Sequence, residues 1–280
     1  MQALGSVQQE EFVIDSQRNR FFDFKEIWRY RELFFFFTWR DIKIKYKQTL
    51  LGFLWAILQP LLMMTIFTLF FGRALGIPSQ NLPYPVYVFS GLLVWNFFSS
   101  GLTSASNSMV NNASIIKKIY FPRLIIPVSA VLVALFDFLM AFTLFAALLI
   151  FYHQPVSWIA VVMWPLGVLV AIVATLGLGS WLAALNVKYR DFRYVIPFLV
   201  QVLFFLTPVI YPVSLLDSPV LQYMLAASPV YAAVELFRYP LVGEIGNWFY
   251  LWISLVSGIV FLAVGILYFK RTEDFFADLA

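Results

Sequence analysis

Six long apolar stretches alternate with short polar or cationic segments along this chain. A helix needs roughly 20 apolar residues to cross about 30 Å of hydrocarbon, so each stretch predicts one membrane-spanning helix. The predicted spans are residues 50–71, 86–102, 124–151, 158–185, 194–211 and 249–269. Serine and asparagine side chains dilute the second span. The pattern therefore predicts an all-α membrane protein with six transmembrane helices.

The positions of lysine and arginine predict how these spans are oriented. The segment before the first span holds nine, the segments after the second and fourth spans hold three each, and the C-terminus holds two. Only Arg73 and Arg238 fall on the other side. Cationic loops resist translocation, so we expect a multi-pass protein of the inner (plasma) membrane with both termini in the cytoplasm. The net charge of +4 is then a topology signal and indicates no nucleic-acid partner.

The composition agrees with a membrane protein and excludes the chemistry that requires cysteine. Hydrophobic residues make up 62% of the 280 positions and charged residues 12%, against about 45–50% and 25% in an ordinary soluble domain. The chain has no cysteine, which excludes disulfides, thiolate metal sites and cysteine nucleophiles. Residues 1–24 form a polar leader without the apolar core of a signal peptide, so the first span is expected to direct insertion. We divide the remainder into an interfacial segment (25–48), a six-span domain (49–270) and a cytoplasmic tail (271–280).

Residues 25–48 are too charged to span, yet they carry many aromatic and aliphatic side chains. This composition predicts an amphipathic helix at the cytoplasmic interface, with Trp28 and Trp39 at headgroup depth and the cations facing water or lipid phosphate. The alternation in DIKIKYK (41–47) also suits a strand, but an edge strand beside a bilayer leaves backbone groups unpaired. We therefore expect a helix that leads into the first span, with the joint near Thr49.

Two further segments expected on the cytoplasmic side combine apolar and cationic residues. In NNASIIKKIYFPR (111–123), a helix would turn Lys117 and Lys118 away from one apolar face and would end before Pro122. That face consists of Ile115, Ile116, Ile119 and Tyr120. A short amphipathic surface helix and a solvated loop anchored by its charges both fit this pattern. The turn in NVKYRDFRY (186–194) is interpreted as a topology determinant.

Asp137 is the one charged side chain deep inside a predicted span. An intramembrane carboxylate is costly unless it is paired or neutralised. No other predicted span offers a lysine, arginine or histidine near its centre, so we favour a protonated or interfacially hydrogen-bonded Asp137 with a packing role over a proton relay. His153 has no ligand partner at metal spacing, which predicts a solvated loop residue and no metal site.

The segment between the fifth and sixth spans, residues 212–248, is expected on the external side. Its apolar pieces are too short to cross, so we predict two short re-entrant helices broken at Ser228-Pro229, forming an external gate. Glu235 and Arg238 stand at i and i+3, which predicts a local ion pair. Prolines in and after the fifth span are expected to kink it. They are Pro197, Pro208 and Pro212.

Four segments resemble the signatures of ABC-2 type permeases that export polysaccharides such as O-antigen, capsule and teichoic acid. They are RYRELFFFFTWRDIKIKYKQTLLGFLWAILQPLLMMTIFTLFFG (29–72), NNASIIKKIYFPR (111–123), NVKYRDFRYVIPFLVQVLFFLTPVIYP (186–212) and SPVYAAVELFRYPLVG (228–243). The resemblance extends from about residue 29 to residue 270 in the expected order. It does not include the polar leader.

The resemblance implies a homodimeric permease that pairs with two copies of a separate ABC ATP-binding subunit. This chain contains no G-x-x-x-x-G-K-[ST] loop, so ATP and magnesium are expected in the partner subunit and no cofactor in this chain. The family pattern implies that the interfacial helix and the loop after the second span contact the ATPase. The residues expected to couple the two subunits are Arg40, Lys43, Ile115, Lys117, Lys118, Tyr120 and Arg123.

A polysaccharide offers hydroxyls and apolar CH faces, so its path needs aromatic platforms and hydrogen-bonding groups. The resemblance implies that the first, second and fifth spans line this path. The candidate path residues are Trp55, Gln59, Tyr87, Trp95, Asn96, Phe98, Ser99, Gln201, Phe204 and Tyr211, and the candidate gate residues are Ser228, Pro229, Glu235 and Arg238. The alternative for the aromatic residues is packing or an interfacial belt facing lipid.

These expectations describe a permease, and not an enzyme, that moves a lipid-linked, O-antigen-like polysaccharide from the cytoplasm across the membrane with energy from a partner ATPase. An ABC-2 exporter of another cargo, such as a lipid or drug, is the alternative within the family. A secondary transporter would show discontinuous helices and coupling-ion carboxylates near the membrane midplane, where only Asp137 qualifies.

Overall fold

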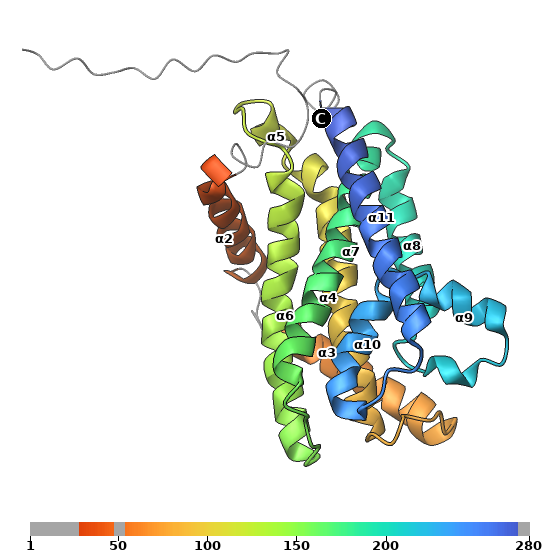
Figure 1. Cartoon of the computed structure of the whole chain (residues 1–280). Coiled ribbons are helices and arrows are strands. Elements are labelled where there is room, and N and C mark those ends of the chain that lie inside the picture. Colours follow the sequence, from red (N-terminus) through yellow and green to blue (C-terminus); the bar gives the residue numbers. More distant parts are fainter. Residues whose placement is uncertain (1–27, 48–53, 274–280) are drawn as a thin grey trace, which may run out of the picture.

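The computed structural model describes residues 28–47 and 54–273, and within these ranges the chain is helical and contains no strand. Its elements are α2 (Arg31–Lys47), α3 (Leu54–Phe67), the π-helix η1 (Thr68–Ala74), α4 (Tyr84–Asn111), α5 (Ala113–Ile116), α6 (Ile125–Phe151), α7 (Ala160–Lys188), α8 (Phe192–Leu206), the 3-10 turn η2 (Val213–Leu215), α9 (Pro219–Ala226), α10 (Tyr231–Val242) and α11 (Trp248–Thr272). Figure 1 shows the long helices side by side in one bundle. The predicted all-α class is confirmed.

Within the described ranges, five helices are long and apolar enough to cross a membrane: α3 with η1, α4, α6, α7 and α11. The expected fifth span is shorter. Its helix, α8, has 15 residues, which corresponds to about 22 Å of rise. Thr207 precedes Pro208 and is extended, because a residue before proline is pushed out of the helical region. Pro208 and Pro212 therefore follow the end of α8, and the prediction that they kink a continuous span was wrong; Pro197 lies inside the helix.

The helix α4 runs through the middle of the bundle and packs against α3, α6, α7 and α10 (Figure 1). Most of its side chains are buried, including Ser90 of the predicted span and Ser106 beyond it, whereas Ser99 and Ser100 are partly buried. Ser90 donates to the carbonyl of Tyr87 at 2.7 Å, and Ser106 donates to that of Leu102 at 2.6 Å. The helix backbone thus accepts the hydroxyl hydrogens of these buried serines. The hydroxyl oxygen of Ser90 also accepts from Nε of Arg238 at 3.3 Å.

The helices α7 and α11 approach each other most closely where two glycines meet. A Cβ atom on Gly265 would overlap the carbonyl oxygen of Gly177, and a Cβ atom on Gly177 would collide with the backbone of Leu262. The absence of a side chain at both positions lets the two backbones touch, which is how small residues favour tight packing between membrane helices.

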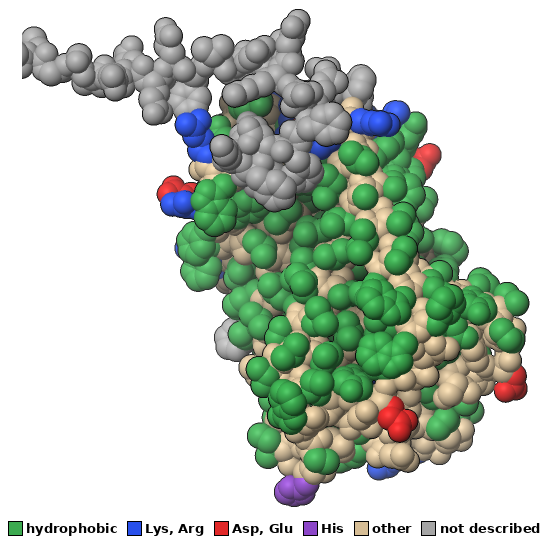
Figure 2. Space-filling model, viewed as in Figure 1, with side chains coloured by type: hydrophobic (Ala, Val, Ile, Leu, Met, Phe, Trp, Pro, Cys, Tyr) green, Lys and Arg blue, Asp and Glu red, His purple; other side chains and the backbone are tan. Residues whose placement is uncertain are grey.

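The cationic loops gather at one end of the bundle, as expected for segments on a common side of the membrane. Figure 1 shows α5, the turn between α7 and α8 and the C-terminal end of α11 at the same end. On the face shown in Figure 2, hydrophobic side chains cover the middle and most Lys and Arg side chains lie toward that end. The helix α6 runs to the opposite end, where His153 is exposed in the following turn, as predicted.

The helix α2 lies beside α6 (Figure 1), which confirms the helical interpretation of DIKIKYK. It does not sort its side chains onto an apolar and a charged face. Phe35, Trp39 and Lys43 are all exposed, and only Phe37 is buried. The amphipathic character of this segment is therefore not confirmed, its interfacial placement stays a prediction, and the joint near Thr49 lies outside the described residues.

The predicted break at Ser228-Pro229 is present. It separates α9 from α10, and the axes of these two short helices differ in direction by 97°. The helix α10 ends at Gly243, whose φ of 83° is in the left-handed region that glycine adopts without strain. The re-entrant placement of this pair stays a prediction.

Candidate functional site

Arg40 joins α2 to the end of α4 nearest the cationic loops, which we call the cationic end of the bundle. Its Nη2 atom donates to Oδ1 of Asn112 at 2.7 Å, and its guanidinium also contacts Asp41. The guanidinium carbon lies 4.9 Å from the centre of the Phe37 ring, which in turn lies 5.6 Å from the ring of Phe121. A displacement of α2 would therefore be passed directly to the segment that follows α4.

Asp137 has partners, and they come from α2. Lys45 forms an ion pair with one oxygen of Asp137, and the hydroxyl of Tyr46 donates to the other. The hydrogen bond that was expected as one of two alternatives is present, and the ion pair with Lys45 was not expected. The search for a partner among the spans missed Lys45, because helix packing brings α2 against the middle of α6.

The segment after α4 forms less helix than the predicted amphipathic face requires. The helix α5 ends at Ile116, and Ile119 and Tyr120 are 62% and 66% exposed. Phe121 is buried, because the chain turns after α5 and places this ring against Phe37. The four-residue apolar face was therefore a wrong prediction. Of its members only Ile116 is fully buried, while Ile115 is partly buried.

The cations of this segment fall into two groups. Lys117 and Lys118 are exposed, as surface coupling residues would be. Arg123 instead reaches the end of α11: its guanidinium donates to the carbonyl of Glu273, and its backbone N–H donates to Oε1 of Glu273 at 3.2 Å. Lys270 lies 3.1 Å from the same carboxylate. Arg123 thus ties the start of α6 to α11.

Three helices that were expected to line the substrate path meet through aromatic rings. The ring of Phe204 on α8 lies 5.3 Å from that of Trp95 on α4 and 5.8 Å from that of Phe67 on α3. Other candidates on α4 lie deeper. Tyr87 and Phe98 have no exposed surface, so they contact protein and not solvent, lipid or cargo in this conformation.

The outward candidates lie on α3 and α8. Trp55 and Gln59 are exposed on α3, and Gln201 is exposed on α8. One face of α8 carries a stripe of exposed side chains at helical spacing, which we call the α8 stripe. The α8 stripe consists of Tyr194, Phe198, Gln201 and Phe205. Beyond it, the Tyr211 hydroxyl donates to the carbonyl of Phe205 at 2.6 Å.

Asn96 stands out among the polar candidates. The Nδ2 atom of this side chain is buried and has no hydrogen-bond partner within the described part of the chain. The neighbouring Ser99 donates to the main-chain carbonyl of Asn96 at 3.3 Å and does not contact the side-chain amide. A buried unpaired polar group costs about 1–3 kcal/mol, so this position favours a partner from outside the described residues.

Arg238 does not form the predicted ion pair with Glu235 among the described residues. Its guanidinium lies 3.9 Å from the centre of the Tyr87 ring and donates to the Tyr87 hydroxyl at 3.0 Å. It also donates to the carbonyls of Pro208, at 2.8 Å, and Val209. These carbonyls follow the proline-terminated end of α8, so their need for donors outweighs a local pair within α10. The prediction was wrong because the competing acceptors come from other helices.

The break between α9 and α10 is tied to α11 by hydroxyl groups. Ser254 donates to the carbonyl of Ser228 at 2.6 Å and accepts from the N–H of Ala232 at 2.9 Å. The hydroxyl groups of Ser228 and Thr207 are 2.9 Å apart, which adds a contact to the end of α8. Backbone groups freed by the break thus find partners inside the protein.

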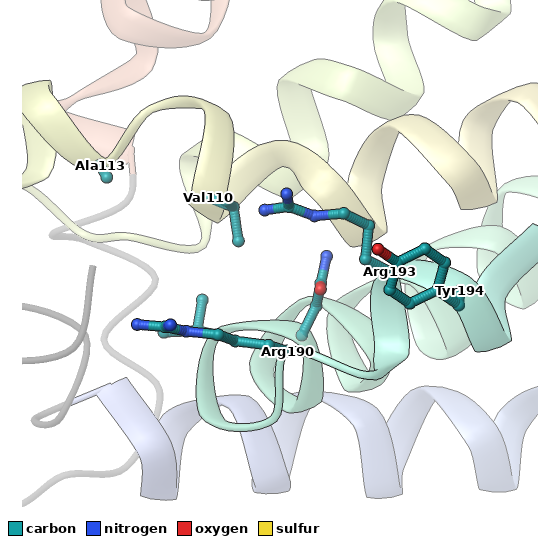
Figure 3. Close-up of a pocket in the computed structure, with 7 residues that line it drawn as sticks. Val110, Ala113, Arg190, Arg193 and Tyr194 are labelled. Carbon is teal, nitrogen blue, oxygen red and sulfur yellow. The ribbon is translucent and has the colours of Figure 1, made fainter.

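A cavity of about 460 Å³ lies at the cationic end, between the α4–α5 and α7–α8 connections. It is lined by Val110, Ala113, Asn186, Val187, Arg190, Arg193 and Tyr194. In Figure 3, Arg190 and Arg193 extend from the α7–α8 side toward the side on which Val110 and Ala113 lie. We call this the arginine cavity. Elsewhere in the described ranges, no group of three or more His, Asp or Glu side chains is arranged to hold a metal ion.

Comparison with known proteins identifies the class. The family model described as ABC-2 type transporter matches residues 32–242, so the chain belongs to the ABC-2 type transporter family. The resemblance seen in the sequence is thereby confirmed, and the chain is a multi-pass membrane protein.

Three individual relatives show which members of the family this chain is similar to. The O-antigen export system permease protein RfbA of Myxococcus xanthus is 33% identical over 216 residues, which cover 76% of this chain and 82% of the relative. A protein of the same name from Klebsiella pneumoniae is 28% identical over 86% of this chain and 92% of its own length. The polysialic acid transport protein KpsM of Escherichia coli is 23% identical over 84% of this chain and 91% of the relative.

Proposed function

We propose that this chain is the membrane-spanning permease of an ATP-driven exporter that moves a lipid-linked, O-antigen-like polysaccharide from the cytoplasm across the inner membrane. The observation that carries the proposal is its similarity, over about three quarters or more of both chains, to permeases named for O-antigen export. ATP hydrolysis takes place in a separate ABC subunit, two copies of which pair with a homodimer of this chain. Both termini lie in the cytoplasm.

The contacts of α2 support a role in coupling. Through Arg40 and Asn112 this helix is fixed to the end of α4, and through Lys45 and Asp137 it is fixed to the middle of α6. Lys117 and Lys118 project from the neighbouring turn and are free to meet an acidic surface of the ATPase. A push on this turn and on α2 would therefore move α4 and α6 together.

The exposed faces of α3 and α8 support a path between two copies of the chain. The α8 stripe presents three aromatic rings and one amide at intervals of three or four residues, which is about 4.5–6 Å of rise. This spacing offers stacking surfaces and hydrogen bonds to successive parts of a glycan. Gln59 and Trp55 on α3 add the same chemistry.

The test is transport in reconstituted vesicles that contain this permease and its ATPase. We expect glycan uptake into inside-out vesicles to require ATP, to stop with vanadate and to be insensitive to an ionophore. The Lys117→Glu/Lys118→Glu variant should lose most transport while inserting normally, because reversed charges repel the ATPase surface. Arg73→Glu, which reverses an exposed cation outside the coupling region, is the control and should transport at the rate of the unaltered protein.

Uptake that persists without the ATPase and follows an ion gradient would overturn the proposal in favour of a secondary transporter. ATP-dependent uptake of lipids or drugs, with no uptake of glycan, would support the partner ATPase but contradict the proposed cargo.

A further inference from the structure

We propose that the arginine cavity binds the phosphate or diphosphate group of a membrane-borne amphiphile. The proposal rests on the proposed function, in which the cargo is attached to a lipid, and it names the chemistry by which the lipid end of that cargo is recognised. The volume of about 460 Å³ lies within the roughly 300–1,000 Å³ of small-molecule sites.

The charge of the cavity favours an anion. Both Arg190 and Arg193 line it, and neither guanidinium has a hydrogen-bond or ion-pair partner in the described part of the chain. Asp191 stands between them in the sequence, is exposed and does not line the cavity. Two guanidinium groups with unused donors match the oxygen atoms of a phosphate group, which accepts bidentate hydrogen bonds.

The remaining lining residues hold the cavity open beside these arginines. The amide of Asn186 donates to the carbonyl of Ser106 and to Oδ1 of Asn107, both at 3.0 Å, which fixes the end of α7 against α4. Val110 and Val187 supply apolar walls. A fixed, partly apolar cavity with charged donors suits the junction between a headgroup and its hydrocarbon chain.

The position of the cavity favours a ligand that arrives through the membrane. Tyr194 lines it and is 81% exposed, and it is the first residue of the α8 stripe. Phe198, the next residue of that stripe, is 67% exposed along the apolar helix α8. An amphiphile held by its phosphate at Arg190 and Arg193 would therefore rest its hydrocarbon chain, or the sugar attached to it, against the outward face of α8. Basic pockets between membrane helices at the cytoplasmic side are suited to lipid phosphates in this way.

The test measures binding to the full-length permease in nanodiscs of zwitterionic lipid, without ATPase and without transport. The probes are farnesyl diphosphate, farnesol and inorganic diphosphate. We expect farnesyl diphosphate to bind at least tenfold more tightly than either of the others. The Arg190→Gln/Arg193→Gln variant should weaken its binding at least tenfold. The charge-matched control is Lys188→Gln/Arg271→Gln, which removes two exposed cations outside the cavity and should change affinity less than twofold.

Several outcomes would overturn the inference. Equal binding of inorganic diphosphate would make the cavity a site for soluble anions. An equal loss of farnesyl diphosphate affinity in the control variant would show that the net charge of the protein, and not the cavity, determines binding. Unchanged farnesyl diphosphate binding in the arginine variant, together with lost capture of the ATPase, would assign the cavity to the partner protein. The binding assay requires no ATP, so it is independent of transport. If farnesyl diphosphate binding depends on Arg190 and Arg193 but the protein does not export glycan, only the proposed function is refuted.

Discussion

Lys45 and Asp137 lie 92 positions apart in the chain and form an ion pair between α2 and the middle of α6. The hydroxyl of Tyr46 donates to the second oxygen of the same carboxylate. This cluster fastens a charged helix that precedes the first span to a membrane-spanning helix that follows the second. It is the contact through which α2 reaches furthest along the bundle.

The first prediction concerns this ion pair. Asp137→Asn should lower the midpoint of thermal unfolding by a few degrees, because a partly exposed pair contributes about 1 kcal/mol. Asp137→Leu should lower it further, since it also removes the acceptor of Tyr46. The exchanged pair Lys45→Asp/Asp137→Lys should recover part of the loss. A double-mutant cycle that gives zero coupling energy between the two positions would show that the pair contributes nothing.

The second prediction is a pH dependence that arises from Tyr46. Its burial, and then the hydrogen bond to Asp137 and the charge of that carboxylate, raise the pKa of Tyr46 above the ordinary value of 10.0. A raised pKa means that the folded protein favours the neutral phenol, so this contribution to stability is fully present below pH 10 and is lost as the pH rises above it. Tyr46→Phe should remove this loss. Unfolding measured by denaturant at pH 8 to 11 would check it, and identical profiles for both proteins would contradict it.

The third prediction concerns Arg238, which is 2% exposed and holds the non-helical end of α8. Arg238→Met should destabilise the protein by about 3 kcal/mol or more, because it leaves buried carbonyl groups without donors. Arg238→Lys should be intermediate, since an ammonium group cannot span the acceptors that the planar guanidinium reaches. Arg73→Met, at an exposed cation, is the matched control and should leave the unfolding midpoint unchanged. Equal midpoints for Arg238→Met and the control would refute the capping role.

The fourth prediction concerns the closest approach of α7 and α11. Gly265→Ala should destabilise the protein by about 1–3 kcal/mol or more, because the added methyl group overlaps the Gly177 carbonyl and forces the two helices apart. Gly246→Ala is the control, since a Cβ atom there meets nothing within 4 Å. Unfolding midpoints in one detergent would compare the two variants, and a stable Gly265→Ala protein would show that the helices separate without cost.

The pattern of apolar and charged residues located most of the helices, but it did not reveal several of the side-chain contacts between them. The bounds of α6 and α11 agree with the apolar stretches to within a few residues. The reason is that the length and apolar composition of a segment decide by themselves whether it forms a membrane-spanning helix. Asp137 was assigned no ionic partner, because only spans were searched, whereas its partner precedes the first span. A search for cations on every neighbouring helix would have included Lys45. Asn112 was assigned no role, because no sequence signal marked it as the acceptor for Arg40.

The sequence by itself determined the class of this protein. Apolar length, cation placement and four family segments predicted a helical, multi-pass ABC-2 permease, and these are local properties that folding does not alter. Only the tertiary structure decided which polar groups meet. Arg238 donates to the carbonyls of Pro208 and Val209, beyond the end of α8, and does not pair with the nearby Glu235. The turn between α7 and α8, interpreted as a topology signal, forms one wall of a cavity whose two arginines have no side-chain partner among the described residues. The physical reason is that a buried charged group takes the best acceptors within reach in space, and distance along the chain does not reveal which these are.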